Sequence, residues 1–154
     1  MSTIRGLLAE QPFLAGLDAT NIDQIAACAR EEHYASDVAL IAAGDDADRF
    51  WLIRSGRVAV EVDTPSGGPI ILETLGPGEV LGVSWVLPPY RTTFDARTVD
   101  PTDAWCIDAV ELRARCERSP ELAAALFHRF AGVVHDRLQA ARLQLLDLYG
   151  RHER

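Results

Sequence analysis

The stretch that decides the fold is GPGEVLGVSWVLPPYRTTFDAR, residues 76–97. It opens with a glycine-punctuated turn, continues into a short apolar segment and reaches a rigid Pro-Pro loop at residues 88–89. An Arg-Thr pair, Arg91 and Thr92, then begins a run that is typical of extended structure. Backbone amides freed by turns, a hydroxyl and a guanidinium are groups that bind anions well. The stretch therefore predicts an anion-binding loop, supported by the segments on either side of it.

Upstream of this loop the sequence predicts two short helices followed by strands. Residues 2–10 carry apolar residues at helical spacing, and Asp18 or Thr20 can cap a second helix. From Arg30 onward, short extended runs are separated by turns. Residues 58–63 show the clearest two-residue period in the chain, which indicates a strand.

Downstream of the loop, residues 92–99 and 104–107 are predicted to form two more strands. The chain then contains roughly eight short strands with turns about every ten residues, a pattern typical of a jelly roll. The predicted fold class is mainly β with flanking helices. More specifically, we expect an eight-stranded jelly-roll barrel followed by a long C-terminal helix.

The last part of the sequence is predicted to be helical. Residues 110–117 form one short helix, and Ser119 caps the next one. That second helix continues without a strong stop signal to Gly150. We therefore expect residues 1–118 to form the N-terminal helices and the barrel, and residues 119–150 to form the long helix of the same structural domain.

The long helix carries an apolar stripe that a barrel of this size cannot cover completely. About thirty helical residues extend roughly 45 Å. The second half of the stripe therefore needs a partner, and the simplest partner is a second copy of the chain. The alternative is a helix folded back on its own barrel. The residues assigned to a dimer helix are Leu126, Phe130, Val134, Leu138, Ala141 and Leu145.

Composition and charge argue against several classes of protein. The 154 residues are 48% hydrophobic and 25% charged, and the net charge is −8. An acidic chain lacks the basic face that phosphate neutralisation requires, so we expect no nucleic-acid binding. The apolar runs are too short to span a bilayer and the N-terminus lacks a signal-peptide core, which predicts a cytoplasmic protein without membrane contact. Cys28, Cys106 and Cys116 match no metal-binding spacing and fit reduced, structural thiols.

Several motifs stand in a recognisable order along the chain. They are PFLAGL at residues 12–17, two segments at residues 41–45 and 48–58, GEVLG at residues 78–82, and RTT at residues 91–93. In this order and at these intervals they resemble the opening, the strand-turn-strand core and the phosphate-binding cassette of one family. That family is the cyclic nucleotide-binding domain of the catabolite-activator and fumarate-nitrate regulator superfamily.

The resemblance implies a ligand and a set of residues that hold it. Members of the family bind a cyclic phosphate through the amides of a short helix, one Arg and a neighbouring Ser or Thr. The short helix here would be Val83–Val86. The implied ligand is a cyclic nucleotide or another small anion, and no other cofactor is expected. The implied phosphate-binding residues are Gly78, Gly82, Val83, Ser84, Arg91 and Thr92.

The sequence departs from the family pattern at both sides of the ligand. Nucleotide-binding members have a Glu directly after the second cassette glycine that holds the ribose hydroxyl, and here that position is Val83. Glu79 is the earlier acid of the motif, before the second cassette glycine, and is not a substitute for the Glu that holds the ribose. The long helix of the family offers polar groups to the base, and the matching positions lie near Arg137 and Leu138.

In the transcription factors a helix-turn-helix follows, whereas this sequence ends at Arg154, so we expect no sequence-specific DNA binding.

The residue pattern does not favour an enzyme. Jelly-roll metalloenzymes bring two or three His and a Glu to one metal ion, and the four histidines of this chain lack such spacing. The sequence also shows no Ser-His-Asp set and no Walker loop. No catalytic residue and no metal ligand is therefore assigned.

These observations predict a stand-alone sensor or regulatory module that is a homodimer and acts through a protein partner. Its cassette keeps the anion side of the site and loses the ribose side at Val83. The first alternative is a working receptor for cyclic AMP or cyclic GMP. The second is a ligand-free interaction scaffold whose pocket is filled by Trp85 or another side chain. We expect Trp85, Pro88, Pro89 and Tyr90 to make the mouth of the pocket bulky and stiff.

Overall fold

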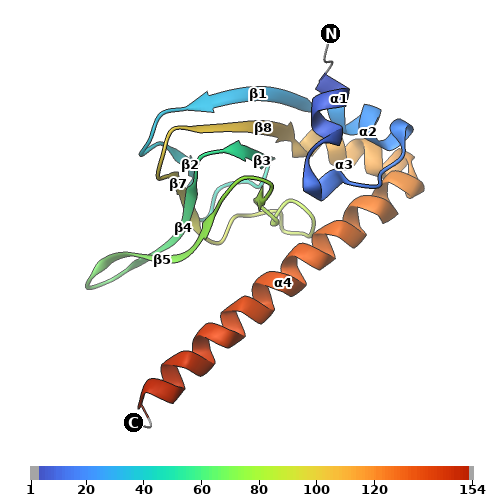
Figure 1. The fold of residues 1–154 in the computed structure, drawn as a ribbon. Coiled ribbons are helices and arrows are strands. Elements are labelled where there is room, and N and C mark those ends of the chain that lie inside the picture. Colours follow the sequence, from blue (N-terminus) through green and yellow to red (C-terminus); the bar gives the residue numbers. More distant parts are fainter. Residues whose placement is uncertain (1–3, 153–154) are drawn as a thin grey trace.

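The structure is a computed structural model, and it describes residues 4–152. Figure 1 shows two sheets of short strands beside a group of helices, with a long last helix that runs past the sheets. Eight strands are found in the described residues, as the sequence predicts. Their hydrogen-bond ladders are all antiparallel and join them into two four-stranded sheets, where the sequence predicts one barrel.

The order of strands in each sheet brings distant segments together. In spatial order, the first sheet consists of β1 (Ala29–Tyr34), β8 (Thr102–Asp108), β3 (Arg49–Ser55) and β6 (Val80–Leu81). The second sheet consists of β2 (Ala39–Ile41), β7 (Asp95–Thr98), β4 (Val58–Thr64) and β5 (Gly68–Leu75). The loop that the sequence singles out leaves the first sheet at the end of β6 and enters the second sheet at β7.

Both faces of β3 are buried, and this explains its unbroken apolar sequence. Phe50 and Leu52 pack into one cluster with residues of the helices. Trp51 and Ile53 point to the other face and pack into a second cluster with residues of β2, β4, β5 and β7. Successive side chains of a strand alternate between faces, so one strand can hold two layers together. Strand β3 therefore packs against the helices with one face and against the second sheet with the other.

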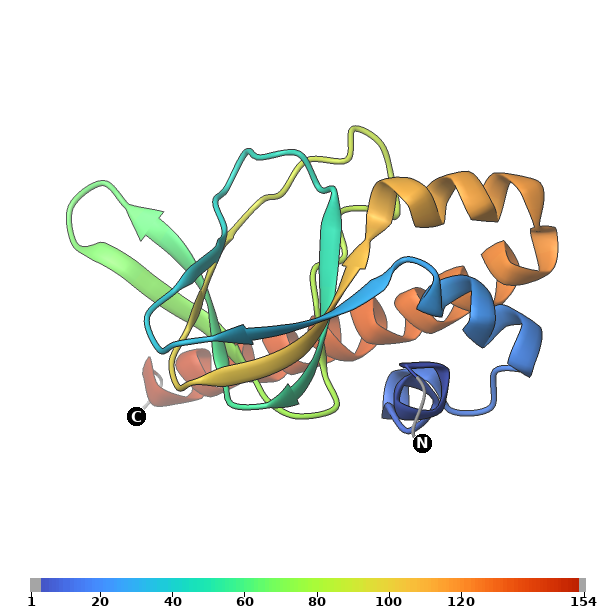
Figure 2. The same ribbon diagram turned by 90° about the horizontal axis from the view of Figure 1, so that it is seen from above.

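The helical layer gathers at one end of the sheets (Figure 2). It contains α1 (Ile4–Ala9), the 3-10 turn η1 (Pro12–Leu14), α2 (Ala19–Ala26) and α3 (Ala109–Arg118). The structure decides between the two candidate caps of α2, because the Asn21 amide donates to Asp18 Oδ1 over 3.1 Å. Residues 2 and 3 of the first predicted helix lie outside the described residues.

The long helix α4 (Pro120–His152) has 33 residues, or roughly 50 Å. Ser119 precedes it as predicted and accepts a hydrogen bond from the Leu122 amide over 3.4 Å. The helix continues past Gly150, where the sequence predicts its end. Leu126 and Phe130, assigned from the sequence to a dimer seam, are instead buried in the chain's own core. The barrel and its helices therefore cover the first part of the apolar stripe.

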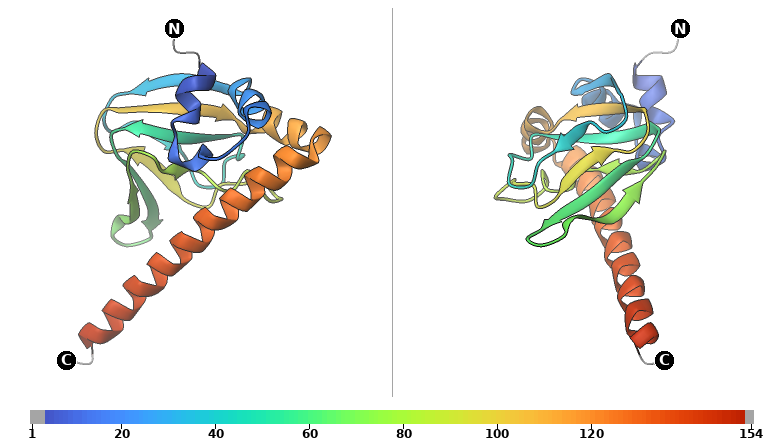
Figure 3. Two further views of the ribbon diagram at one scale, coloured as in Figure 1. Left: turned by 45° about the vertical axis from the view of Figure 1, so that its right-hand side comes forward. Right: turned by 90° about the vertical axis from the view of Figure 1, so that its left-hand side faces the viewer.

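The second part of α4 extends beyond the sheets, as both views of Figure 3 show. Val134, Leu138, Ala141 and Leu145, which follow the buried part of the stripe, all have exposed side chains. Exposure of a regular apolar stripe is what the predicted homodimer requires. Within residues 4–152, no helix combines the length and apolar composition needed to cross a membrane.

Candidate functional site

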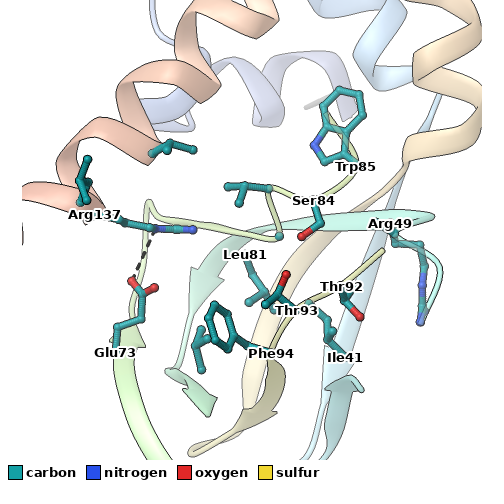
Figure 4. Close-up of a pocket in the computed structure, with 16 residues that line it drawn as sticks. Ile41, Arg49, Glu73, Leu81, Ser84, Trp85, Thr92, Thr93, Phe94 and Arg137 are labelled. Atoms are coloured by element: carbon teal, nitrogen blue, oxygen red, sulfur yellow. Dashed lines mark ion pairs between the residues drawn. The ribbon is translucent and has the colours of Figure 1, made fainter. Parts of the chain in front are cut away.

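A cavity of about 320 Å³ opens where the two sheets meet α4 (Figure 4). Its wall is formed by strands of both sheets, by the loop after β6, by the segment before β7 and by α4. The lining residues are Ile41, Ala47, Arg49, Val60, Glu73, Leu81, Gly82, Val83, Ser84, Trp85, Thr92, Thr93, Phe94, Val134, Arg137 and Leu138. Nine of these side chains are apolar and six are polar or charged, a mixture that suits a small-molecule site.

Gly82 lets the chain turn sharply from β6 into the cavity wall. Its φ angle is +100°, and a Cβ atom there would lie 3.3 Å from the Cβ of Phe50. A larger residue would therefore be strained by its backbone and crowded by β3. Gly82 is therefore required by the backbone. The turn it makes places the backbone of Val83 and Ser84 beside the cavity.

The segment Val83–Val86, predicted as a short helix, is a single turn. One hydrogen bond closes it, from the Val86 amide to the Val83 carbonyl over 3.3 Å. A helix cannot extend from so short a start, because Pro88 and Pro89 follow and disfavour helical residues before them. Within residues 4–152, the amides of Val83, Ser84 and Trp85 donate to no protein acceptor. The segment thus still offers free donors, although without a helix.

Trp85 is anchored in the core, where the sequence predicts a bulky residue at the mouth. Its indole stacks on Phe50 with 5.0 Å between ring centroids and meets Phe130 of α4 edge-on at 5.1 Å. Arg113 of α3 donates to the Trp85 carbonyl over 2.9 Å. The indole is fully buried, and its Nε1–H has no acceptor among the described residues. The ring therefore packs into the core and does not fill the cavity.

Arg91 does not line the cavity. Its Nη1 lies 3.4 Å from the Asp46 carboxylate and donates to the Gly44 carbonyl over 3.2 Å, and its side chain is 59% exposed. Thr92 does line the cavity, but its hydroxyl donates to the Ala42 carbonyl over 2.7 Å. In this arrangement both residues fasten the turn between β2 and β3.

Of the other residues implied by the resemblance, Gly82, Val83 and Ser84 line the cavity and Gly78 does not. The Gly78 amide donates to the Ile53 carbonyl over 2.8 Å. Glu79 also lies outside the lining, since its carboxylate accepts the Gly76 amide over 2.8 Å. Both residues therefore shape the turn before β6.

The long helix contributes Val134, Arg137 and Leu138 to the wall, so α4 reaches the cavity where the resemblance places it. Leu138 offers no polar group. Arg137 donates from Nη2 to the Val80 carbonyl, and its Nε lies 3.5 Å from Oε1 of Glu73 on β5. The polar contact of α4 in this cavity is therefore a guanidinium.

Four polar or aromatic lining residues are absent from the binding residues assigned from the sequence: Arg49, Glu73, Thr93 and Phe94. Thr93 and Phe94 directly follow Arg91 and Thr92 in the sequence, and this position next to the cassette could have indicated that they line the pocket. Arg49 and Glu73 arrive from strands β3 and β5 and depend on the packing of two sheets. No local motif marks them.

The three thiols are buried, and His33 is exposed. Burial raises the pKa of the Cys28 thiol to about 11, and burial also raises the pKa of Cys106 and of Cys116. Buried, protonated thiols are poor nucleophiles. A hydrogen bond to Asp103 raises the pKa of His33, which lies on the surface. In the described part of the chain, no three His, Cys, Asp or Glu side chains are arranged to hold a metal ion.

Two relatives of known name are similar to most of this chain. Glutaminase 2 of Bradyrhizobium diazoefficiens is 32% identical over 146 residues, which are 92% of this chain and 22% of the relative. The CRP-like cAMP-activated global transcriptional regulator of Mycobacterium tuberculosis is 28% identical over 109 residues, 71% of this chain and 47% of the relative. The chain thus spans about a fifth and about half of the lengths of these two proteins.

A solved structure supports the same fold. The crystal structure of a candidate cyclic nucleotide-binding protein from Geobacter metallireducens superposes with a TM-score of 0.78 at 25% identity. The match covers 86% of this chain and 96% of that one. Residues 31–119 match the family model described as the cyclic nucleotide-binding domain. With more than half of its residues in that match, the chain belongs to the cyclic nucleotide-binding domain family.

Proposed function

We propose that this chain is a regulatory module that binds a cyclic nucleotide, held mainly by its phosphate, and signals occupancy through α4. The observation that carries the proposal is the group of unengaged donors beside an open cavity. The amides of Val83, Ser84 and Trp85 have no acceptor in residues 4–152, and neither do the hydroxyls of Ser84 and Thr93. Successive free amides of this kind form a concave site for an anion.

Arg91 is available to such a ligand at small cost. Its ion pair with Asp46 is exposed, with 59% and 75% of the two side chains accessible. Exposed ion pairs contribute about 0–1 kcal/mol to the stability of a folded protein. A phosphate at the neighbouring loop therefore competes easily with Asp46 for the Arg91 guanidinium. Thr92 keeps its structural hydrogen bonds in this account.

The pocket lacks the cassette acid that would recognise the ribose hydroxyl of a cyclic nucleotide. Val83 supplies no acceptor at the position where the family resemblance puts the acid for the ribose hydroxyl. A site without that acceptor loses the selectivity that a buried hydrogen bond provides. The base would lie on an apolar wall formed by Phe94, Val134 and Leu138.

The signal passes through Trp85. Its backbone amide belongs to the donor group, while its ring packs on Phe130 of α4. A ligand that moves the loop therefore changes the packing of the helix, and a two-state population shift follows if the two positions of α4 bind the ligand unequally.

Two observations favour action through protein partners. The exposed stripe on α4 suits a second copy of the chain, which gives the homodimer predicted from the sequence. The matching part of Glutaminase 2 is 22% of that protein, so in that relative a domain of this kind belongs to a longer enzyme. A ligand-free scaffold is less favoured, because Trp85 packs into the core and leaves about 320 Å³ open.

Isothermal titration calorimetry with cyclic AMP and cyclic GMP tests the proposal. We expect binding to the wild-type protein that Thr93→Trp abolishes, because the indole fills the cavity from an exposed position. Thr74→Trp is the matched control, since Thr74 is an exposed threonine of β5 outside the lining. Absence of heat with either nucleotide at millimolar concentration would overturn the proposal.

A further inference from the structure

The guanidinium of Arg137 occupies a wall shared by two cavities. One is the cavity described above, and the other, of about 440 Å³, lies between η1, the start of β6 and α4. Arg137 and Glu73 line both. Their side chains are 24% and 35% exposed, and the Arg137 Nε lies 3.5 Å from the Glu73 Oε1.

Three other arginines near the cavity, Arg49, Arg91 and Arg113, contact other groups in this structure, and Arg113 donates to the Ala47 and Trp85 carbonyls. Arg49 lines the cavity, but its guanidinium lies over the Trp51 ring at 5.1 Å and near Asp48 at 3.7 Å. Figure 4 shows it directed away from Ser84 and Thr93. Arg91 is outside the lining and contacts Asp46. In the same figure Arg137 extends from α4 across the cavity wall toward Leu81.

We infer that Arg137 is the cation that an anionic ligand of this pocket meets, and that the ligand replaces Glu73 as its partner. The inference rests on the proposed function and assigns its charge recognition to α4. Glu73 then acts as a carboxylate placeholder for the ligand's negative charge. A guanidinium binds carboxylate and phosphate through the same fork of donors, so one can exchange for the other.

This exchange couples ligand binding directly to the helix. Without ligand, the Arg137–Glu73 ion pair fastens α4 to β5, and the Arg137 bond to the Val80 carbonyl fastens it to β6. When an anion takes the guanidinium, β5 loses its charge contact with the helix. The second cavity gives the released Glu73 side chain space to turn away from the incoming negative charge.

Titration of cyclic AMP into charge-neutral variants tests the inference. Arg137→Gln should weaken binding about tenfold or more, the effect of losing one charge-assisted bond. Arg91→Gln should weaken it less than Arg137→Gln does. Glu73→Gln should tighten binding, because it removes the competing carboxylate. Arg142→Gln, an exposed arginine of the same helix outside both cavities, is the matched control and should change nothing.

The sign of the Glu73→Gln effect separates ligand contact from a structural role. If the ion pair only stabilises the fold, Glu73→Gln leaves affinity unchanged or weakens it, and the inference is overturned. Wild-type affinity in Arg137→Gln, with binding lost in Arg91→Gln, also overturns it while the proposed function stands. If Arg137→Gln does not fold, shown by loss of its thermal transition, Glu73→Gln alone decides. No binding by the wild-type protein refutes the proposed function and this inference with it.

Discussion

The indole ring of Trp85 meets the ring of Phe130 at 82°, with 5.1 Å between the two centroids. This contact joins the loop after β6 to the buried part of α4. The same indole stacks on Phe50 of β3 at 5.0 Å. The loop that offers free amides to the cavity is therefore fixed at one end to the sheet and to the helix. This packing gives the pocket a physical connection to α4.

Replacing Trp85 should destabilise the domain strongly. Trp85→Ala removes a fully buried indole and leaves a cavity, so we expect a loss of about 3–5 kcal/mol in the free energy of unfolding. Urea titration followed by circular dichroism measures it. Leu87→Ala is the control on the same loop, because Leu87 is 72% exposed and its loss should change stability by less than about 0.5 kcal/mol. Equal effects of the two variants would show that Trp85 does not anchor the loop.

The strands were predictable because their patterns are local. Residues 58–63 alternate and form most of β4, and the apolar run of residues 50–53 forms the buried strand β3. The division into two sheets could not be predicted in the same way. It depends on which strands pair, such as β6 with β3 through only Leu81–Trp51 and Val80–Leu52.

The site could be predicted only in part, for the same reason. Gly82, Val83 and Ser84 form one continuous stretch beside the cavity, and the sequence singled out that stretch. Arg91 belongs to the same motif, but its ion-pair partner Asp46 is distant in sequence. A long exposed side chain turns toward the nearest opposite charge that the fold brings close to it. The orientation of such a side chain depends on tertiary neighbours that no motif records.

The Val83 position should decide whether the pocket distinguishes ribose from deoxyribose. Because Val83 provides no acceptor, we expect cyclic AMP and 2′-deoxy cyclic AMP to bind the wild-type protein equally. Val83→Glu should create a preference of about tenfold or more for cyclic AMP, the effect of one hydrogen bond to a charged acceptor. Val83→Leu adds bulk without an acceptor and should leave the ratio at one. A wild-type protein that already prefers the ribose would contradict this account of the pocket.

The exposed stripe on α4 should hold two copies of the chain together. Leu145 is 53% exposed and lies beyond the cavity, so Leu145→Glu adds charge to the stripe without touching the pocket. We expect sedimentation equilibrium to show a wild-type dimer and a Leu145→Glu monomer at equal concentration. Gln139→Glu adds the same charge at an exposed position off the stripe and should remain dimeric. A dimeric Leu145→Glu variant would place the interface elsewhere.

The three thiols should be unreactive until the domain unfolds. Burial raises the pKa of Cys28 to about 11 and raises those of Cys106 and Cys116, so all three are protonated and covered near neutral pH. Since the thiolate is the nucleophile, labelling by Ellman's reagent at about pH 8 should be slow in the native protein. Labelling should become fast for all three thiols in urea. Rapid labelling of one thiol in the native state would identify a reactive cysteine instead.

Hydrogen exchange measured by mass spectrometry, with and without saturating cyclic AMP, tests the central claim most directly. The claim is that binding of a ligand at the loop after β6 changes the packing of α4. We predict slower exchange at residues 83–85, altered exchange in α4 at residues 130–137, and no change in β1. Identical exchange with and without the nucleotide, or changes confined to segments away from both the loop and α4, would contradict the claim.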